Sequence, residues 1–231
     1  MIFSIYPHIH LVIAIGELLG AGWSIRLWLQ SKSVAMIVLS VVLLGIGYDN
    51  LLLASGTSIG LGELLQSLSQ VRFLVHHLFV PFLIVVGVEL AHRTGAFWAN
   101  NFTRSLAWIL SIGLGTIDIA NRYIGVKLEP VIFAGVLRYT ASTGGLPIIA
   151  IAVTIFVLLV GIGIWIRSGG KWYWLFVGTL VALIGNALPL SMVGTLPGSL
   201  AEFFMTLTLL LTERYVQRNL TAVGRESPVP D

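Results

Sequence analysis

The sequence predicts an all-α, polytopic membrane helix bundle. Of its 231 residues, 57% are hydrophobic and only 10% are charged. Soluble domains carry about 25% charged residues, so this chain has too few charges to cover a water-facing surface. The mean hydropathy is +0.95. The apolar residues also gather into runs of about 20, the length that crosses a hydrocarbon core of about 30 Å as a helix.

Seven apolar runs have the length of a membrane span. They cover residues 9–29, 34–55, 71–91, 104–122, 146–167, 172–192 and 197–215. The segment 129–145 is apolar but short, and Arg138 interrupts it, so we expect an interfacial or re-entrant piece there and not an eighth span. Because the loops are short and no linker divides the chain, we expect a single transmembrane domain over residues 1–215. A short polar cytoplasmic tail, frayed or disordered, is expected over 216–231.

The basic residues predict the orientation. With seven alternating spans, nine arginines and lysines fall on one side and four on the other. The positive-inside rule makes the richer side cytoplasmic, which places the amino terminus outside and the carboxyl terminus inside a plasma or internal membrane. The first residues lack the basic region of a cleavable signal peptide, so we expect the first span to be retained.

Most polar residues inside the spans lie toward the exoplasmic side. Charged groups in hydrocarbon cost several kcal/mol unless they are paired or hydrated, so a one-sided cluster of them indicates a site. Its members are Glu17, Asp49, Asn50, Arg72, His76, His77, Asp118, Asn121, Arg122, Asn186 and Glu202.

The sequence RFLVHH near the start of the third span carries the sharpest pattern. Arg72 and His76 are four residues apart and share a helix face, while His77 lies about 100° further round. Asp49 ends the preceding helix at a similar depth, so we expect an Asp–Arg–His network between the two helices. Three interpretations remain open: a structural clamp, an acid/base or ligand-binding site, and metal or haem ligation.

The other polar residues also allow two interpretations each. Glu17 shares a helix face with His10 and Ser24, and is either a buried acid that delivers a proton or a carboxyl bonded to the backbone. Asp118 and Arg122 are spaced as an intrahelical ion pair, with Asn121 on the face of Asp118. We predict ligand-binding roles for Glu17, Asn50, Arg72, Asp118, Asn121 and Asn186.

Glu202 follows Pro197 and precedes two phenylalanines. A carboxylate beside aromatic rings suits a cationic ligand or a carbocation, although carboxylates also favour the first turn of a helix for its dipole. We predict catalytic, proton-transferring roles for Asp49, His76, His77 and Glu202.

Several kinds of chemistry have no support in the sequence. The absence of cysteine excludes disulfides and thiolate catalysis, and none of the common nucleotide, zinc-protease or hydrolase motifs is present. The last span has no lysine for a retinal Schiff base. We therefore expect no cofactor, no metal and no nucleic acid, and membrane lipid and an apolar small molecule as partners.

Two short elements resemble those of small integral-membrane carotenoid cyclases of the lycopene type. Tyr48-Asp49-Asn50 is similar to the first element, and Pro197 followed by Glu202-Phe203-Phe204 is similar to the second, with one acid instead of two and a longer spacing. Separately, spans two and three and spans six and seven are each joined by an Asn, a Gly-rich outer loop and a polar residue just inside the next helix, which suggests a 3+1+3 pseudo-repeat. The resemblance implies cofactor-free, proton-initiated cyclisation or isomerisation of an isoprenoid.

The chain departs from that pattern before the third span. Arg72, His76 and His77 stand where the cyclases carry paired glutamates, a change that suits an anionic headgroup or a quinone oxygen. Three functions follow: an enzyme acting on an isoprenoid or lipid, a lipid- or quinone-binding protein or proton-coupled transporter, and a structural membrane subunit without catalysis.

Overall fold

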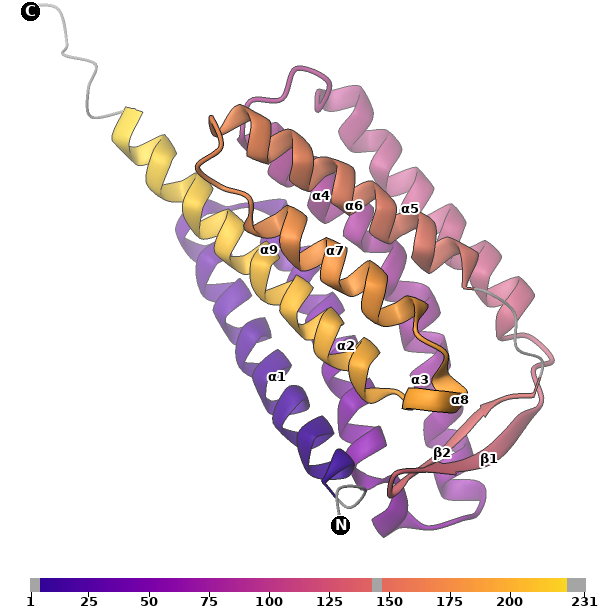
Figure 1. Ribbon diagram of the computed structural model, residues 1–231. Coiled ribbons are helices and arrows are strands. Elements are labelled where there is room, and N and C mark those ends of the chain that lie inside the picture. Colours follow the sequence, from indigo (N-terminus) through magenta and orange to yellow (C-terminus); the bar gives the residue numbers. More distant parts are fainter. Residues whose placement is uncertain (1–4, 143–146, 224–231) are drawn as a thin grey trace, which may run out of the picture.

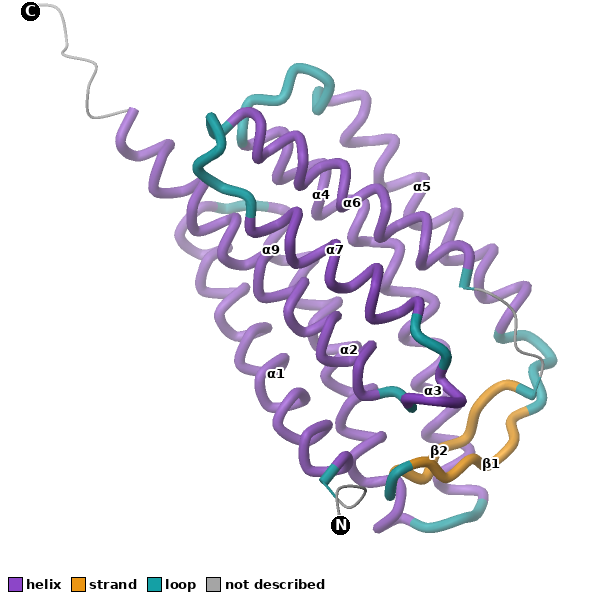
Figure 2. Tube along the Cα trace, viewed as in Figure 1, coloured by secondary structure: helices purple, strands orange, loops and turns teal. Residues whose placement is uncertain are grey.

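The computed structural model describes residues 5–142 and 147–223, most of which belong to one bundle of long helices (Figures 1 and 2). A two-stranded hairpin covers one end of the bundle. The elements are α1 (Tyr6–Ser31), α2 (Val34–Ile59), α3 (Glu63–Phe79), η2 (Val80–Phe82), α4 (Leu83–Arg93), α5 (Asn101–Arg122), β1 (Leu128–Phe133), β2 (Val136–Ala141), α6 (Ile148–Arg167), α7 (Trp174–Ala187), α8 (Leu190–Val193) and α9 (Leu196–Val223).

Four helical segments are long and apolar enough to cross a membrane. They are Tyr6–Ser31, Val34–Ile59, Glu63–Arg93 and Ile148–Arg167. Large apolar side chains also cover the outside of the bundle, where Leu19, Ile109 and Ile166 are 71%, 67% and 72% exposed. Exposed apolar surface on this scale marks contact with something other than water, and lipid fits the apolar helices.

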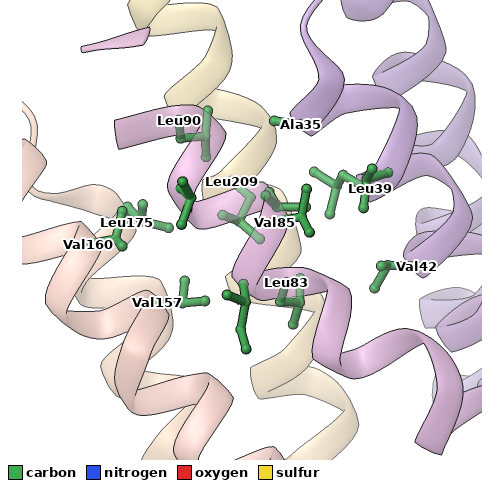
Figure 3. Close-up of a cluster of buried hydrophobic side chains, with 14 of the residues drawn as sticks. Ala35, Leu39, Val42, Leu83, Val85, Leu90, Val157, Val160, Leu175 and Leu209 are labelled. Atoms are coloured by element: carbon green, nitrogen blue, oxygen red, sulfur yellow. The ribbon is translucent and has the colours of Figure 1, made fainter. Parts of the chain in front are cut away.

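The core is built around α4. All residues from Leu83 to Ala91 are buried, and Figure 3 shows Leu83, Val85 and Leu90 among side chains from α2, α6, α7 and α9. Small residues let α7 approach α9 closely, because a Cβ at Gly178 would overlap the side chain of Thr208. Close backbone approach of this kind is how helices pack where burial from water provides no driving force.

A proline divides the rod formed by α3 and α4. Pro81 lies in the 3-10 turn η2 between them, since proline has no backbone N–H and its ring displaces the carbonyl one turn earlier. The hydroxyl of Ser111 on α5 donates to the Pro81 carbonyl oxygen at 2.9 Å. The break is thus bonded to a neighbouring helix, and it separates the polar α3 from the apolar α4.

The segment predicted to be interfacial or re-entrant is a β-hairpin. β1 and β2 are antiparallel, with Phe133 opposite Val136, so Ala134 and Gly135 form a two-residue turn with positive φ at both positions. Positive φ at both central residues is the type I′ geometry that suits a hairpin. The hydroxyl of Thr57 on α2 donates to the Gly135 carbonyl at 2.6 Å, which ties the turn to the bundle.

The predicted boundaries agree with most of the helices and fail at three. α3 begins at Glu63, eight residues before the predicted span at 71, and α7 ends at Ala187 instead of 192. α9 continues to Val223, so the first part of the predicted tail is helical; residues 224–231 lie outside the described residues, as does the predicted start of the fifth span at Leu146. The pseudo-repeat stays a prediction.

The two ends of the bundle are named here by what they carry. The hairpin end holds β1, β2 and the start of α1, and the opposite end holds the loops after α1, α4 and α6 and the end of α9 (Figure 1).

Candidate functional site

A cavity of about 850 Å³ opens at the hairpin end. Its wall is made by α2, α3, α5, β2, α6, α7 and α9, together with the segment between α7 and α9. The volume lies in the roughly 300–1,000 Å³ range of ligand sites. Its ionisable and amide-bearing residues are Asp49, Arg72, His76, His77, Asp118, Asn121, Arg122, Arg138, Asn186 and Glu202.

The predicted Asp–Arg–His network between α2 and α3 is present. Arg72 Nη1 donates to Asp49 Oδ1 at 3.1 Å, and the other carboxylate oxygen lies 3.8 Å from His76 Nδ1. The Arg72 guanidinium also donates to the Tyr139 carbonyl oxygen at 3.5 Å, which brings the hairpin onto α3. Asp49 is therefore held by an arginine on one oxygen and faces a histidine with the other.

A second histidine–carboxylate pair joins α3 to α5. His77 Nδ1 lies 2.8 Å from Asp118 Oδ2. The sequence suggested an intrahelical pair of Asp118 with Arg122, and the structure adds this cross-helix partner, which spacing along one helix cannot reveal. No hydrogen bond of the Nε2 atom of His76 or His77 is found within the described residues.

Glu202 faces the same cavity from α9. Its Oε1 accepts a hydrogen bond from Asn186 Nδ2 at 3.1 Å. The two phenylalanines that follow it do not accompany it into the cavity: the Phe203 ring packs against Gly16 of α1 instead. Aromatic stabilisation of a cation beside Glu202, expected from the sequence, therefore has no support from Phe203.

Glu17 and Asn50, predicted to bind ligand, lie behind the cavity wall in a buried polar chain. Thr195 Oγ1, on the wall, is 3.0 Å from His10 Nε2; His10 Nδ1 is 2.8 Å from Asn50 Oδ1; and Asn50 Nδ2 donates to Glu17 Oε2 at 3.2 Å. His10 and Glu17 are 0% exposed. Within the described residues, Glu17 Oε1 has no hydrogen-bond partner.

Sequence reasoning did not assign Arg138 or Thr140 to the site. Successive side chains of a strand point to opposite faces; Leu137 and Tyr139 pack on Leu52 and Leu65, while Arg138 and Thr140 line the cavity. Burial, together with the neighbouring Arg72, lowers the pKa of the Arg138 guanidinium to about 10, so the group is still charged at neutral pH. The alternation could have been found had residues 128–141 been recognised as strands.

The opposite end holds two further buried carboxylates. Glu213, at 0% exposure, accepts from Arg93 at 3.0 Å, Ser31 at 2.9 Å and Gln217 at 2.8 Å on Oε1, and from Ser33 at 3.3 Å on Oε2. Glu89 is bound by Arg104 through two parallel hydrogen bonds of 2.7 and 3.1 Å. Buried polar groups thus lie at both ends of the bundle, whereas the sequence suggested that most lie at one end.

No group of three or more histidine, aspartate or glutamate side chains in residues 5–142 and 147–223 is placed to hold a metal ion. No protein-family model matches the chain, and no curated protein matches it either.

Proposed function

We propose that the chain is a multi-pass protein of a plasma or internal membrane, with seven spans and an exoplasmic amino terminus. The helices outside the four long apolar segments lie alongside them (Figure 2). Among these, α7 is apolar but short, and it packs closely against α9. Exposed Arg26 and Lys171, with Arg93, Arg104 and Arg167, belong to the opposite end, which the positive-inside rule makes cytoplasmic.

In this proposal, the cavity is the site of a cofactor-free cyclase or isomerase that acts on an isoprenoid or another lipid by acid/base chemistry. One observation carries it: His76 facing Asp49, His77 paired with Asp118, and Glu202 all line one cavity. Proton donors and acceptors placed around one ligand are what general acid/base catalysis needs. A purely structural cluster would have no reason to surround a space of this size.

The reaction is balanced without an oxidant or a reductant. An acid, Glu202 or a protonated histidine, gives a proton to one carbon of a double bond, and the neighbouring carbon becomes a cation. A base, His76 or His77 with its carboxylate, takes a proton from an adjacent carbon and restores a double bond. Asp49 and Asp118 orient the imidazoles and stabilise the positive charge that these rings acquire.

The lining suits an apolar substrate with a small polar part. Leu53, Phe73, Ile117, Ile148 and Ile149 contribute an apolar wall next to the ionisable groups. The choice of an isoprenoid rests on the resemblance of Tyr48-Asp49-Asn50 and Glu202-Phe203-Phe204 to the carotenoid-cyclase elements. The Arg72–Asp49 bond fixes the first of these elements beside the cavity.

The first test is what the purified protein carries. Protein extracted in a mild, uncharged detergent is examined by visible spectroscopy, and its organic extract by mass spectrometry. A stoichiometric carotenoid, quinone or other prenyl lipid supports the proposal and identifies the substrate class. A haem band assigns the histidines to ligation and contradicts it.

The second test follows the proton. Turnover of the identified lipid in D₂O leaves one deuterium on a carbon of the product if protonation starts the reaction. His76→Gln and Glu202→Gln are expected to abolish incorporation, while Glu63→Gln, which changes an exposed carboxylate at the same end, leaves it intact. Stoichiometric lipid without turnover makes the protein a binding protein or transporter, and absence of bound lipid favours a structural subunit.

A further inference from the structure

Arg138 lines the cavity without a hydrogen-bond or ion-pair partner among the described residues. Its side chain leaves the face of β2 that also carries Thr140, two residues on, and both line the cavity. The strand itself is fixed: Arg72 donates to the Tyr139 carbonyl, and the Leu137 N–H donates to Thr57 Oγ1 at 3.2 Å. The guanidinium is therefore held over the cavity by a backbone bonded to α2 and α3.

The nearby carboxylates are engaged elsewhere. Asp49 is bound to Arg72, Asp118 to His77, and Glu202 accepts from Asn186. Among the described residues, no hydrogen bond or ion pair of Arg138 is found. Arg72 repels it, and Asp49 attracts it but is already bound by Arg72.

A half-buried cation without a partner is unfavourable, because its loss of hydration is not compensated. Burial and the repulsion from Arg72 both disfavour the charged guanidinium, which is why the pKa of Arg138 is lowered. A bound anion would favour the charged form and so oppose both effects. The guanidinium fork matches oxyanions in geometry, so the unused N–H donors of Arg138 suit oxygen atoms that carry negative charge.

We propose that Arg138 and Thr140 bind the phosphate headgroup of an amphiphilic ligand whose chain lies along the apolar wall of the cavity. This inference rests on the proposed lipid site and names its substrate class. A phosphate monoester carries about −1.5 to −2 charges and three acceptor oxygens, which suits a guanidinium beside a hydroxyl. Ser199 and Arg122 line the same cavity and add a second hydroxyl and a second positive group.

The arrangement also explains why the hairpin covers this end. Ile148 and Ile149, at the start of α6, lie in the cavity wall with Arg138, so apolar and cationic walls meet in one space. A headgroup at β2 and a chain along α6 would share the cavity with His76, His77 and Glu202. The headgroup then positions the reacting carbons, which is a use of binding energy remote from the chemistry.

Three probes separate the parts of the ligand: farnesyl phosphate, farnesol and inorganic phosphate. Binding to the full-length protein in uncharged detergent is measured by calorimetry. We expect farnesyl phosphate to bind at least tenfold more tightly than farnesol. Inorganic phosphate alone is expected to bind weakly. If it binds as tightly as farnesyl phosphate, the site takes a soluble anion and the lipid source is wrong.

Two variants and a control test the residue. Arg138→Gln is expected to weaken farnesyl phosphate at least tenfold and to leave farnesol unchanged. Arg138→Lys should restore part of the loss, since lysine keeps the charge but not the fork. Lys127→Gln, which removes an exposed charge from the same end, should change neither ligand. If farnesyl phosphate and farnesol bind equally and Arg138→Gln changes neither, the phosphate site is wrong but the lipid site is supported. If neither compound binds, the phosphate site and the proposed lipid site are both wrong.

A melting curve gives a readout that a structural role of Arg138 would not produce. Without ligand, Arg138→Gln is expected to raise the melting temperature, because it removes a cation that folding places in an unfavourable site. With farnesyl phosphate, the wild type should rise and the variant should not. A variant that melts lower than the wild type without ligand contradicts the inference, because Arg138 would then stabilise the fold by itself.

Discussion

The two ends of this bundle treat buried charge in different ways. At the opposite end, every carboxylate oxygen of Glu213 and Glu89 accepts at least one hydrogen bond from the protein, and the His92 imidazole donates to the Ala99 carbonyl at 2.6 Å. At the hairpin end, Glu202 has a single amide partner and Arg138 has none among the described residues. At the opposite end the carboxylates are thus fully bonded, although Arg93 Nε has no hydrogen-bond partner among the described residues, and at the hairpin end charged groups face a cavity.

The difference separates stability from function. A buried ion whose partners are all in the protein contributes to a unique structure, and removing one partner is strongly destabilising. A half-buried charge left without a partner does not stabilise the fold and is available to a ligand. We therefore expect mutations at the opposite end to change the free energy of unfolding most, and mutations in the cavity to change ligand binding most.

The largest effect is expected for Glu213→Gln. It leaves Arg93, which is largely buried, with a neutral partner, and should lower the free energy of unfolding by about 3 kcal/mol. Unfolding in mixed micelles with increasing SDS measures it. The double variant Glu213→Gln/Arg93→Met should recover part of the loss. Unchanged unfolding would mean that the opposite end is not held by this pair.

A smaller loss is expected for Gly56→Ala. A Cβ at this position would overlap the Leu137 carbonyl oxygen, so the hairpin must move away from α2 at a cost of about 2 kcal/mol. Ligand binding should fall as well, because Arg138 moves with the strand. Gly113→Ala, where nothing lies within 4 Å of the new Cβ, is the control. If Gly56→Ala changes neither the free energy of unfolding nor ligand binding, the position of the hairpin does not matter for the site.

Asn50→Leu tests the chain behind the cavity wall. It leaves His10 Nδ1 and Glu17 Oε2 buried without partners, which should cost about 2 kcal/mol. The matched change Asn186→Leu, at an exposed amide, should cost less because water can replace the lost bond. Thermal melts of the two variants give the comparison, and equal losses would argue that water does not reach the cavity.

The smallest change in stability is expected for Glu202→Gln, within about 1 kcal/mol, since its bond to Asn186 can be kept by an amide oxygen. The same variant should lose turnover of the lipid substrate. Melting and deuterium incorporation measured on one preparation check both halves. A large loss of stability would mean that Glu202, like Glu213, has a structural role.

The sequence predicted the four long apolar helical segments because runs of this length and composition are typical of membrane spans. It predicted the ends of α3, α7 and α9 less well. It also predicted the Asp49–Arg72–His76 cluster, because two helices joined by a short loop return side by side and place charges of opposite sign at the same depth. These inferences depend on neighbours in sequence, and so spacing is sufficient for them.

The parts that were missed depend on contacts between distant segments. Asp118 was assigned to its own helix, since no pattern links it to His77, which lies 41 residues away. The start of α3 was predicted eight residues too late. Its first two turns contain several polar residues and bury only one face, at Leu65 and Ser69, so they do not form an apolar run. The hairpin escaped notice because Ala134–Gly135 is a weak turn signal: type I′ turns favour Asn-Gly or Asp-Gly, and Ala134 adopts positive φ without being one of these residues.

The buried chain that starts at Thr195 has a direction. Asn50 Nδ2 donates to Glu17 and to the Ile46 carbonyl, so its oxygen faces His10, and a neutral His10 must donate from Nδ1 and accept at Nε2. The Thr195 hydroxyl then donates its only hydrogen to His10, so toward the cavity it can only accept hydrogen bonds. A ligand group that bonds to Thr195 must therefore be a hydrogen-bond donor, so this part of the wall would favour an alcohol over an ether.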